Sequence, residues 1–140
     1  MTQNPFAYRA NQAYRGAAVT VPPLKAVVLL IDGSITALQK AMEAHEARRF
    51  EEGHDQLMRA TAILRGLSHH LDSNRGGALA DRLYRTYGSL IMAALRAYGR
   101  PGARANISRI VKSLTDLREA WKYVDATVAK SAKVGSGGRS

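Results

Sequence analysis

The chain has 140 residues, a net charge of +10, an apolar fraction of 46% and no cysteine. This length suits one domain, and the apolar fraction is too high for a wholly disordered chain. The absence of cysteine excludes disulfide frameworks, thiolate zinc sites and cysteine nucleophiles. The longest apolar stretch, residues 24–31, is far shorter than the roughly 20 residues that span a bilayer, and residues 1–18 lack the pattern of a secretion signal. We therefore expect a cytosolic protein without membrane insertion.

The first helix is predicted to open at Pro22 and Pro23, because proline suits the first turn of a helix. Apolar residues then recur at alternating four- and three-residue steps, which keeps them on one side of a helix: Leu24, Val28, Ile31, Ile35, Leu38 and Met42. The pattern fades in the charged run of residues 43–49. A second helix is predicted over about residues 50–71, and Gly53 near its start leaves the break between the two helices indistinct.

Residues 72–77 combine polar residues with two glycines, which predicts a turn. A third helix follows over about residues 78–98, with an apolar seam from Leu79 to Tyr98, and it stops at the Gly-Arg-Pro-Gly break of residues 99–102. The fourth helix, about 103–129, has the most regular seam. The small polar residues 130–140 are predicted to form a disordered tail.

Short connections force consecutive helices to run antiparallel. The sequence therefore predicts an all-α protein, an antiparallel up-down four-helix bundle of residues 22–129. Residues 1–21 are expected to form an arm or short helix packed on that bundle.

No constellation of catalytic or metal-binding residues is visible. His69 and His70 are adjacent, so they point about 100° apart on a helix, and only one Glu-x-x-His pair occurs, Glu51 with His54. The seams carry apolar residues and no carboxylates. We expect no catalytic residue, no metal and no cofactor, so the protein should not be an enzyme.

The positive charge is concentrated in residues 56–112, which hold ten basic residues and two acidic ones. We interpret the arginines as spread around the helices, which favours a solvated basic surface over a nucleic-acid site. Those that do not keep one helical phase are Arg82, Arg85, Arg96, Arg100 and Arg104. A preference for an acidic partner is the second interpretation. A basic helical module that binds nucleic acid, or a general protein-interaction module, stays open as the alternative function.

Two features suggest how a partner could bind. Phe6, Tyr8 and Tyr14 lie in a polar stretch, and they either dock on the bundle or form a movable flap over an apolar groove that a partner helix fills. Asp32 is predicted to face water on the flank of the first seam, or else to anchor a hydrogen bond. Gly33 beside it suggests that another backbone passes close by.

The ordered set of local patterns resembles the FliS family of flagellar secretion chaperones, from about Tyr8 to Val124. The segments that carry this resemblance are Tyr8–Tyr14, Val27–Gly33, Ala60–Leu67, Leu71-Asp72 with Gly76-Gly77, Leu83–Tyr87 and Leu117–Trp121.

The resemblance implies a helical bundle that binds the C-terminal segment of flagellin, prevents premature polymerisation and delivers flagellin to the flagellar type III export gate. It places Tyr8 and Tyr14 in a covering arm. Leu24, Val28, Ile31 and Ile35 would border the groove, and Asp32-Gly33 would permit close approach of the partner backbone. It assigns core support to Tyr84, Tyr87 and Trp121. We expect a monomer or a weak homodimer.

Overall fold

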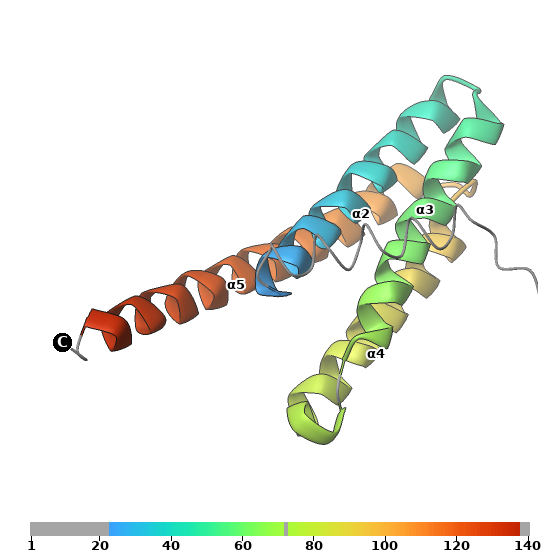
Figure 1. Cartoon of the computed structure of the whole chain (residues 1–140). Helices are drawn as coiled ribbons and strands as arrows, with labels where there is room; N and C mark the ends of the chain where they lie inside the picture. Colours follow the sequence, from blue (N-terminus) through green and yellow to red (C-terminus); the bar gives the residue numbers. More distant parts are fainter. Residues whose placement is uncertain (1–22, 72, 138–140) are drawn as a thin grey trace, which may run out of the picture.

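The computed structural model describes residues 23–71 and 73–137, and this part of the chain forms four helices and no strand (Figure 1). They are α2 (Pro23–Glu46), α3 (Phe50–His69), α4 (Ser73–Ala97) and α5 (Ala103–Gly137). The all-α bundle predicted from the seams is confirmed. The predicted arm, with Tyr8 and Tyr14, lies outside the described residues.

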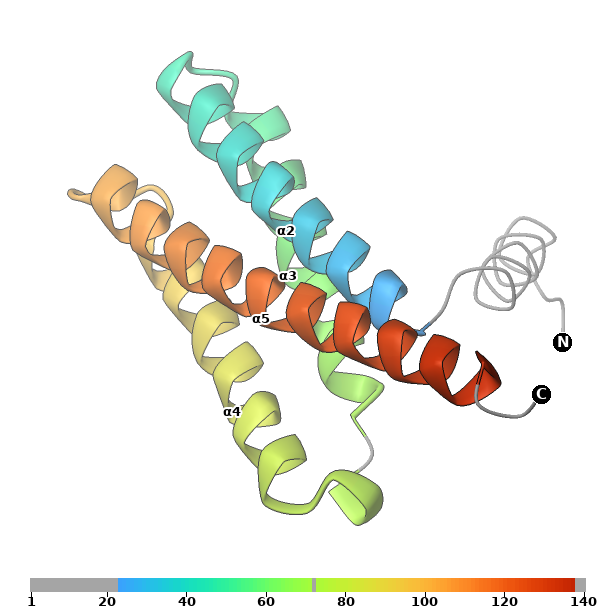
Figure 2. The same cartoon turned by 90° about the vertical axis from the view of Figure 1, so that its left-hand side faces the viewer.

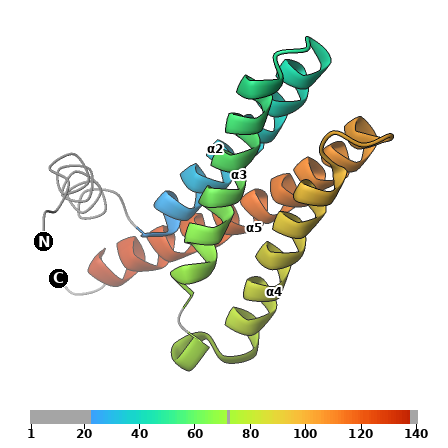
Figure 3. The ribbon, with the colours of Figure 1, turned by 90° about the vertical axis from the view of Figure 1, so that its right-hand side faces the viewer.

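Each helix packs on two others. Helix α2 contacts α3 and α5, and α4 also contacts α3 and α5, with the α4–α5 contact the smallest of the four. The α2–α3 and α4–α5 connections lie at the same end of the bundle (Figures 1 and 3). We call this the turn end. From there the helices diverge, so the opposite end, formed by the start of α2, the end of α3, the start of α4 and the second half of α5, is more open (Figure 2).

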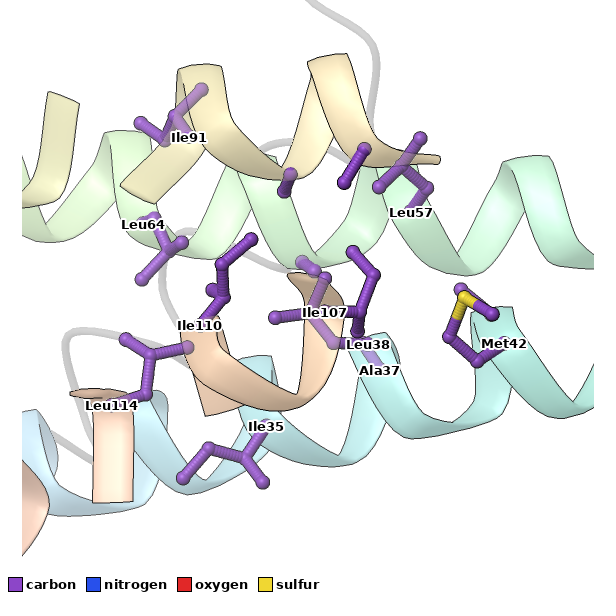
Figure 4. Packing of buried hydrophobic residues seen from close by; sticks show 14 of the residues in the cluster. Ile35, Ala37, Leu38, Met42, Leu57, Leu64, Ile91, Ile107, Ile110 and Leu114 are labelled. Atoms are coloured by element: carbon purple, nitrogen blue, oxygen red, sulfur yellow. The ribbon is translucent and has the colours of Figure 1, made fainter. Parts of the chain in front are cut away.

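The hydrophobic core occupies the turn end and the middle of the bundle. Apolar side chains from all four helices are buried there, and Figure 4 shows Ile110 of α5 between Leu64 of α3 and Ile35 of α2. Ile31, Leu64 and Leu114 have no exposed surface at all. The alternating three- and four-residue seams therefore predicted the core correctly in this half of the molecule.

The backbones of α2 and α3 approach each other closely at Gly53. A Cβ atom built there would clash with the Tyr98 hydroxyl and would lie 3.1 Å from the Ala41 carbonyl oxygen. Tyr98 is itself held edge-on against His45, with 5.1 Å between the ring centroids. Only glycine fits at this position. Gly53 therefore lies inside α3 to allow close packing of the two helices, and it does not mark the break between them.

The connections use backbone conformations with positive φ. The α4–α5 connection contains Gly99 (φ 74°) and Gly102 (φ 77°), which confirms the predicted break. Between α2 and α3 the left-handed position is taken by Arg48 (φ 63°), next to a hydrogen bond from the Arg49 amide to the Ala44 carbonyl. Because arginine lacks the conformational freedom of glycine, this turn has no clear signature in the sequence.

Helices α4 and α5 differ from the predicted ranges. Helix α4 begins inside the predicted turn at Ser73, with a kink at Gly77 (φ 55°, ψ −131°), so the regular helix starts after that glycine, as expected. Helix α5 continues to Gly137, through most of the residues 130–140 that we expected to be a disordered tail. Alanine and lysine dominate residues 129–133, and both favour helix once a helix is already formed.

Candidate partner-binding surface

The apolar seams are longer than the core that they build. At the turn end the seam residues are buried, but toward the open end they become half-exposed in α2, α4 and α5, whereas in α3 they stay buried as far as Leu67. In α5 the seam passes from buried Ile110 and Leu114 to partly buried Leu117 and Trp121, and in α4 it passes from buried Tyr87 to half-buried Leu83 and exposed Leu79. The open end therefore carries apolar surface that the bundle does not cover.

This apolar surface comes from α2, α4 and α5 and from the residue Leu71 just after α3, in the part of the bundle where the helices diverge (Figure 2). The partly buried residues that pack against the core there are Val27, Leu30, Leu71, Leu83, Leu90, Leu117 and Trp121. We call them the open-end surface. Side chains of this kind attract an apolar partner, since covering them removes apolar area from water.

Trp121 connects the open-end surface to the core. It packs beside Tyr87, the largest fully buried side chain of the described residues. Burial raises the pKa of the Tyr87 hydroxyl. The indole N–H of Trp121 has no hydrogen-bond partner among the described residues. Trp121 is also the only tryptophan in the sequence, which makes it a natural optical reporter for this end.

An ion pair borders the open-end surface. The Arg118 Nη1 atom donates a hydrogen bond of 2.6 Å to Asp32 Oδ1, which links α5 to α2. The Asp32 side chain is about half exposed, at 53%, so it lies on the flank of the seam, and it also anchors a hydrogen bond, which was the second expectation for this residue. The hydrogen bond to this carboxylate raises the pKa of the Arg118 guanidinium.

The predicted site residues of α2 fall into two groups. Leu24 and Val28 are half-buried near the start of the helix, at the open end. Ile31 and Ile35 are buried in the core, so within the bundle they support the surface from beneath. A Cβ atom on Gly33 would meet the Ile63 side chain at an ordinary 3.5 Å, so among the described residues no backbone makes the close approach predicted there.

Of the three aromatic residues expected to support the core, the structure places two there. Tyr87 is buried and Trp121 is partly buried against the core, but Tyr84 is 59% exposed. Tyr84 follows Leu83 by one residue, which turns it about 100° away from the seam. The expectation for Tyr84 was therefore wrong.

Sequence reasoning missed most of the open-end surface. Leu83, Leu117 and Trp121 were recognised only as seam residues. Their exposure follows from the divergence of the helices, which seam spacing does not encode. One signal in the sequence could have indicated this exposure. Leu83, Leu117 and Trp121 lie on the halves of their helices farthest from the two short turns.

Other kinds of site find no support in the described part of the chain. No group of three or more histidine or acidic side chains is placed there to hold a metal ion. None of the helices described combines the length and the apolar character needed to cross a membrane.

Comparison with known proteins decides the family. The family model for flagellar protein FliS matches residues 6–128. The chain belongs to the FliS family. It is 29% identical to the flagellar secretion chaperone FliS of Salmonella typhimurium, over 82% of this chain and 85% of that protein. It is 30% identical to the flagellar secretion chaperone FliSB of Pseudomonas aeruginosa, over 66% of this chain and 77% of that protein.

Membership of the FliS family confirms the resemblance inferred from the local patterns. FliS proteins are chaperones and not enzymes, so the expectation of a protein without catalysis is confirmed by the family. The match begins at residue 6 and ends at residue 128, so it includes the open-end surface from Val27 to Trp121.

Proposed function

We propose that this protein is a cytosolic chaperone that holds the C-terminal segment of flagellin, prevents its premature polymerisation and delivers it to the flagellar type III secretion apparatus. The observation that carries the proposal is the open-end surface, an apolar area that the bundle leaves half-covered. The names of the two relatives, both flagellar secretion chaperones, support the same function.

The physical basis is coupled folding and binding. A segment that is unfolded when free loses conformational entropy when it becomes helical on a partner, and it needs a long apolar contact to offset that loss. The open-end surface offers such contacts on α2, α4 and α5. The segment would cover Leu83, Leu117 and Trp121, and Leu24 and Val28 would border its path. Asp32 and Gly33 would lie beside it.

The arm of residues 1–21 completes the proposal. Tyr8 and Tyr14 would cover part of the open-end surface in the free chaperone and leave it when flagellin binds. Transfer to the export gate would then involve the complex and not the free protein. The unit that binds flagellin is residues 22–129, and the protein acts as a monomer or a weak homodimer.

Calorimetric titration with the C-terminal segment of a flagellin from the same genome tests this function. We expect a one-to-one complex, and Leu83→Gln should weaken it about tenfold, because it places a polar group on apolar contact area. Leu95→Gln is the matched control, since Leu95 is an exposed leucine in the other half of α4. Failure to detect a complex with any flagellin of that genome would remove the proposal.

A further inference from the structure

A row of arginines follows one face of α4. Arg82, Arg85 and Arg96 are three and eleven residues apart, which places them within about 60° of one another around the helix axis. This corrects the interpretation for the three arginines of α4, whereas Arg100 and Arg104 lie beyond the end of that helix. Arg82 and Arg85 line a shallow groove of about 520 Å³ between α4 and α5, and Arg96 lines an adjoining one of about 490 Å³ that shares Ser89 with it.

These arginines differ from the basic residues of α5, several of which have a partner within the protein. Arg104 pairs with Glu46 of α2, Lys112 pairs with Asp116 at 2.8 Å, and Arg118 pairs with Asp32. In the part of the chain that the structure describes, no carboxylate pairs with Arg82, Arg85 or Arg96. Their charge is therefore not neutralised within the bundle, and it contributes to the net charge of +10.

Apolar and hydroxyl groups lie between the charges. Leu90, Met92 and Ala93 supply apolar surface along the two grooves, and the hydroxyl-bearing residues there are Thr86, Ser89 and Ser113. The stretch from Arg82 to Arg96 is about 21 Å long at 1.5 Å per residue. A face of this length, with cations in one line and apolar groups beside them, is complementary to an amphipathic helix that carries carboxylates in one line.

We propose that this arginine face of α4 binds an acidic, helix-forming segment of a partner protein. The face adjoins the open-end surface through Leu90, but the proposal goes beyond the function given above and does not depend on what the open end holds. Duplex nucleic acid fits less well. The apolar residues between the arginines would meet phosphates, whereas an amphipathic helix can cover them with apolar side chains.

The test uses the full-length protein and a synthetic helix-forming peptide of about 20 residues. Its glutamates repeat the spacing of Arg82, Arg85 and Arg96, which is three residues and then eleven. The same spacing is also placed in the reverse order, so that the peptide matches the arginines whichever way it runs along α4. A second peptide has glutamine at the same positions. We expect the glutamate peptide to bind about tenfold more tightly at about 50 mM salt, and the preference to shrink at about 300 mM salt because salt screens exposed charges.

The variant Arg82→Glu/Arg85→Glu should abolish the preference for the glutamate peptide. The variant Lys40→Glu/Arg59→Glu makes the same change in net charge on α2 and α3, and it should keep the preference. Circular dichroism checks that both variants are folded.

Equal affinity for the two peptides, or an unchanged preference in the α4 variant, would overturn the proposal. Tighter binding of duplex DNA, lost in the α4 variant, would also overturn it and assign the face to nucleic acid. Titration of the same variants with the flagellin segment reports separately on the open end.

Discussion

The Arg118 guanidinium binds the Asp32 carboxylate across the bundle, with 2.6 Å between Nη1 and Oδ1. The two residues are 86 positions apart in the sequence and join α5 to α2. On α2 the pair lies next to fully buried Ile31, and on α5 it lies between buried Leu114 and partly buried Trp121. The pair therefore marks the level at which the core gives way to the open-end surface.

The pair should contribute little to stability and depend on salt. Asp32 is about half exposed, so we expect a coupling free energy of about 0.2–1 kcal/mol from a double-mutant cycle of Asp32→Asn and Arg118→Gln. Chemical denaturation at low and high salt measures it. The Lys112–Asp116 pair within α5 serves as the control, with a coupling of about 0.3–0.5 kcal/mol. A coupling near zero at low salt would show that Asp32 does not hold α5.

Gly53→Ala should destabilise the bundle by about 1–3 kcal/mol, because the added methyl group meets Tyr98 and the Ala41 carbonyl oxygen. Adding Tyr98→Phe should recover part of this loss, since it removes the clashing hydroxyl. Gly66→Ala is the control in the same helix. A methyl group added there would meet no neighbouring side chain or helix within 4 Å, so this change should stabilise α3 by up to about 1 kcal/mol. Thermal or urea unfolding distinguishes these outcomes, and equal effects at positions 53 and 66 would contradict the packing.

Local patterns predicted the helices well, because the core depends on the same periodicity that the sequence displays. The seams found the buried residues from Ile31 to Leu114, and the glycine-rich break at residues 99–102 was placed correctly. Close packing at Gly53 was not predicted, since its contacts come from Ala41 and Tyr98, which are distant in sequence. The sequence placed the α2–α3 break between residues 43 and 50 but not its exact position, because Arg48 takes a conformation that usually identifies a glycine.

Arg48→Gly should raise the free energy of unfolding by about 0.5–1 kcal/mol. Arg48 has a φ of 63°, a left-handed conformation that glycine adopts without strain. Ala47→Gly, one residue earlier in the same turn, should instead destabilise the protein, because among the described residues other than glycine only Arg48 has a positive φ. Urea denaturation of both variants measures the difference. A loss of stability in Arg48→Gly would show that the arginine side chain matters more than the backbone.

Stability should fall above about pH 10, partly through Tyr87. Burial raises the pKa of its hydroxyl above the ordinary value of 10.0, so the folded state holds the proton more strongly than the unfolded state does. This contribution is fully present below pH 10.0 and is lost as the pH rises through the folded-state pKa. The midpoint of urea unfolding should be measured between about pH 8 and 11.5. It should decline less steeply with rising pH in Tyr87→Phe than in Tyr84→Phe, the exposed control. Identical slopes would contradict this role of Tyr87.

The site was harder to predict than the fold. Of the four residues that the resemblance placed beside a groove, Leu24 and Val28 are half-buried at the open end, whereas Ile31 and Ile35 are buried in the core. Leu83, Leu117 and Trp121 were assigned only to the core seams. Exposure of a seam residue depends on how far the helices diverge, and this is a property of the whole bundle. The positive charge of α4 was equally hard to interpret from the sequence, because only the folded bundle shows which arginines lack an acidic partner.

The central claim, that the open-end surface holds the flagellin segment, is tested most directly by the fluorescence of Trp121. Titrating the full-length protein with a tryptophan-free C-terminal segment of flagellin from the same genome should shift the emission to shorter wavelength, because the segment covers the indole. The shift should saturate at one segment per chaperone, and circular dichroism should show the segment gaining helix over the same range. A stable complex that leaves the emission unchanged would contradict the assignment of the site, and the absence of any complex would contradict the function.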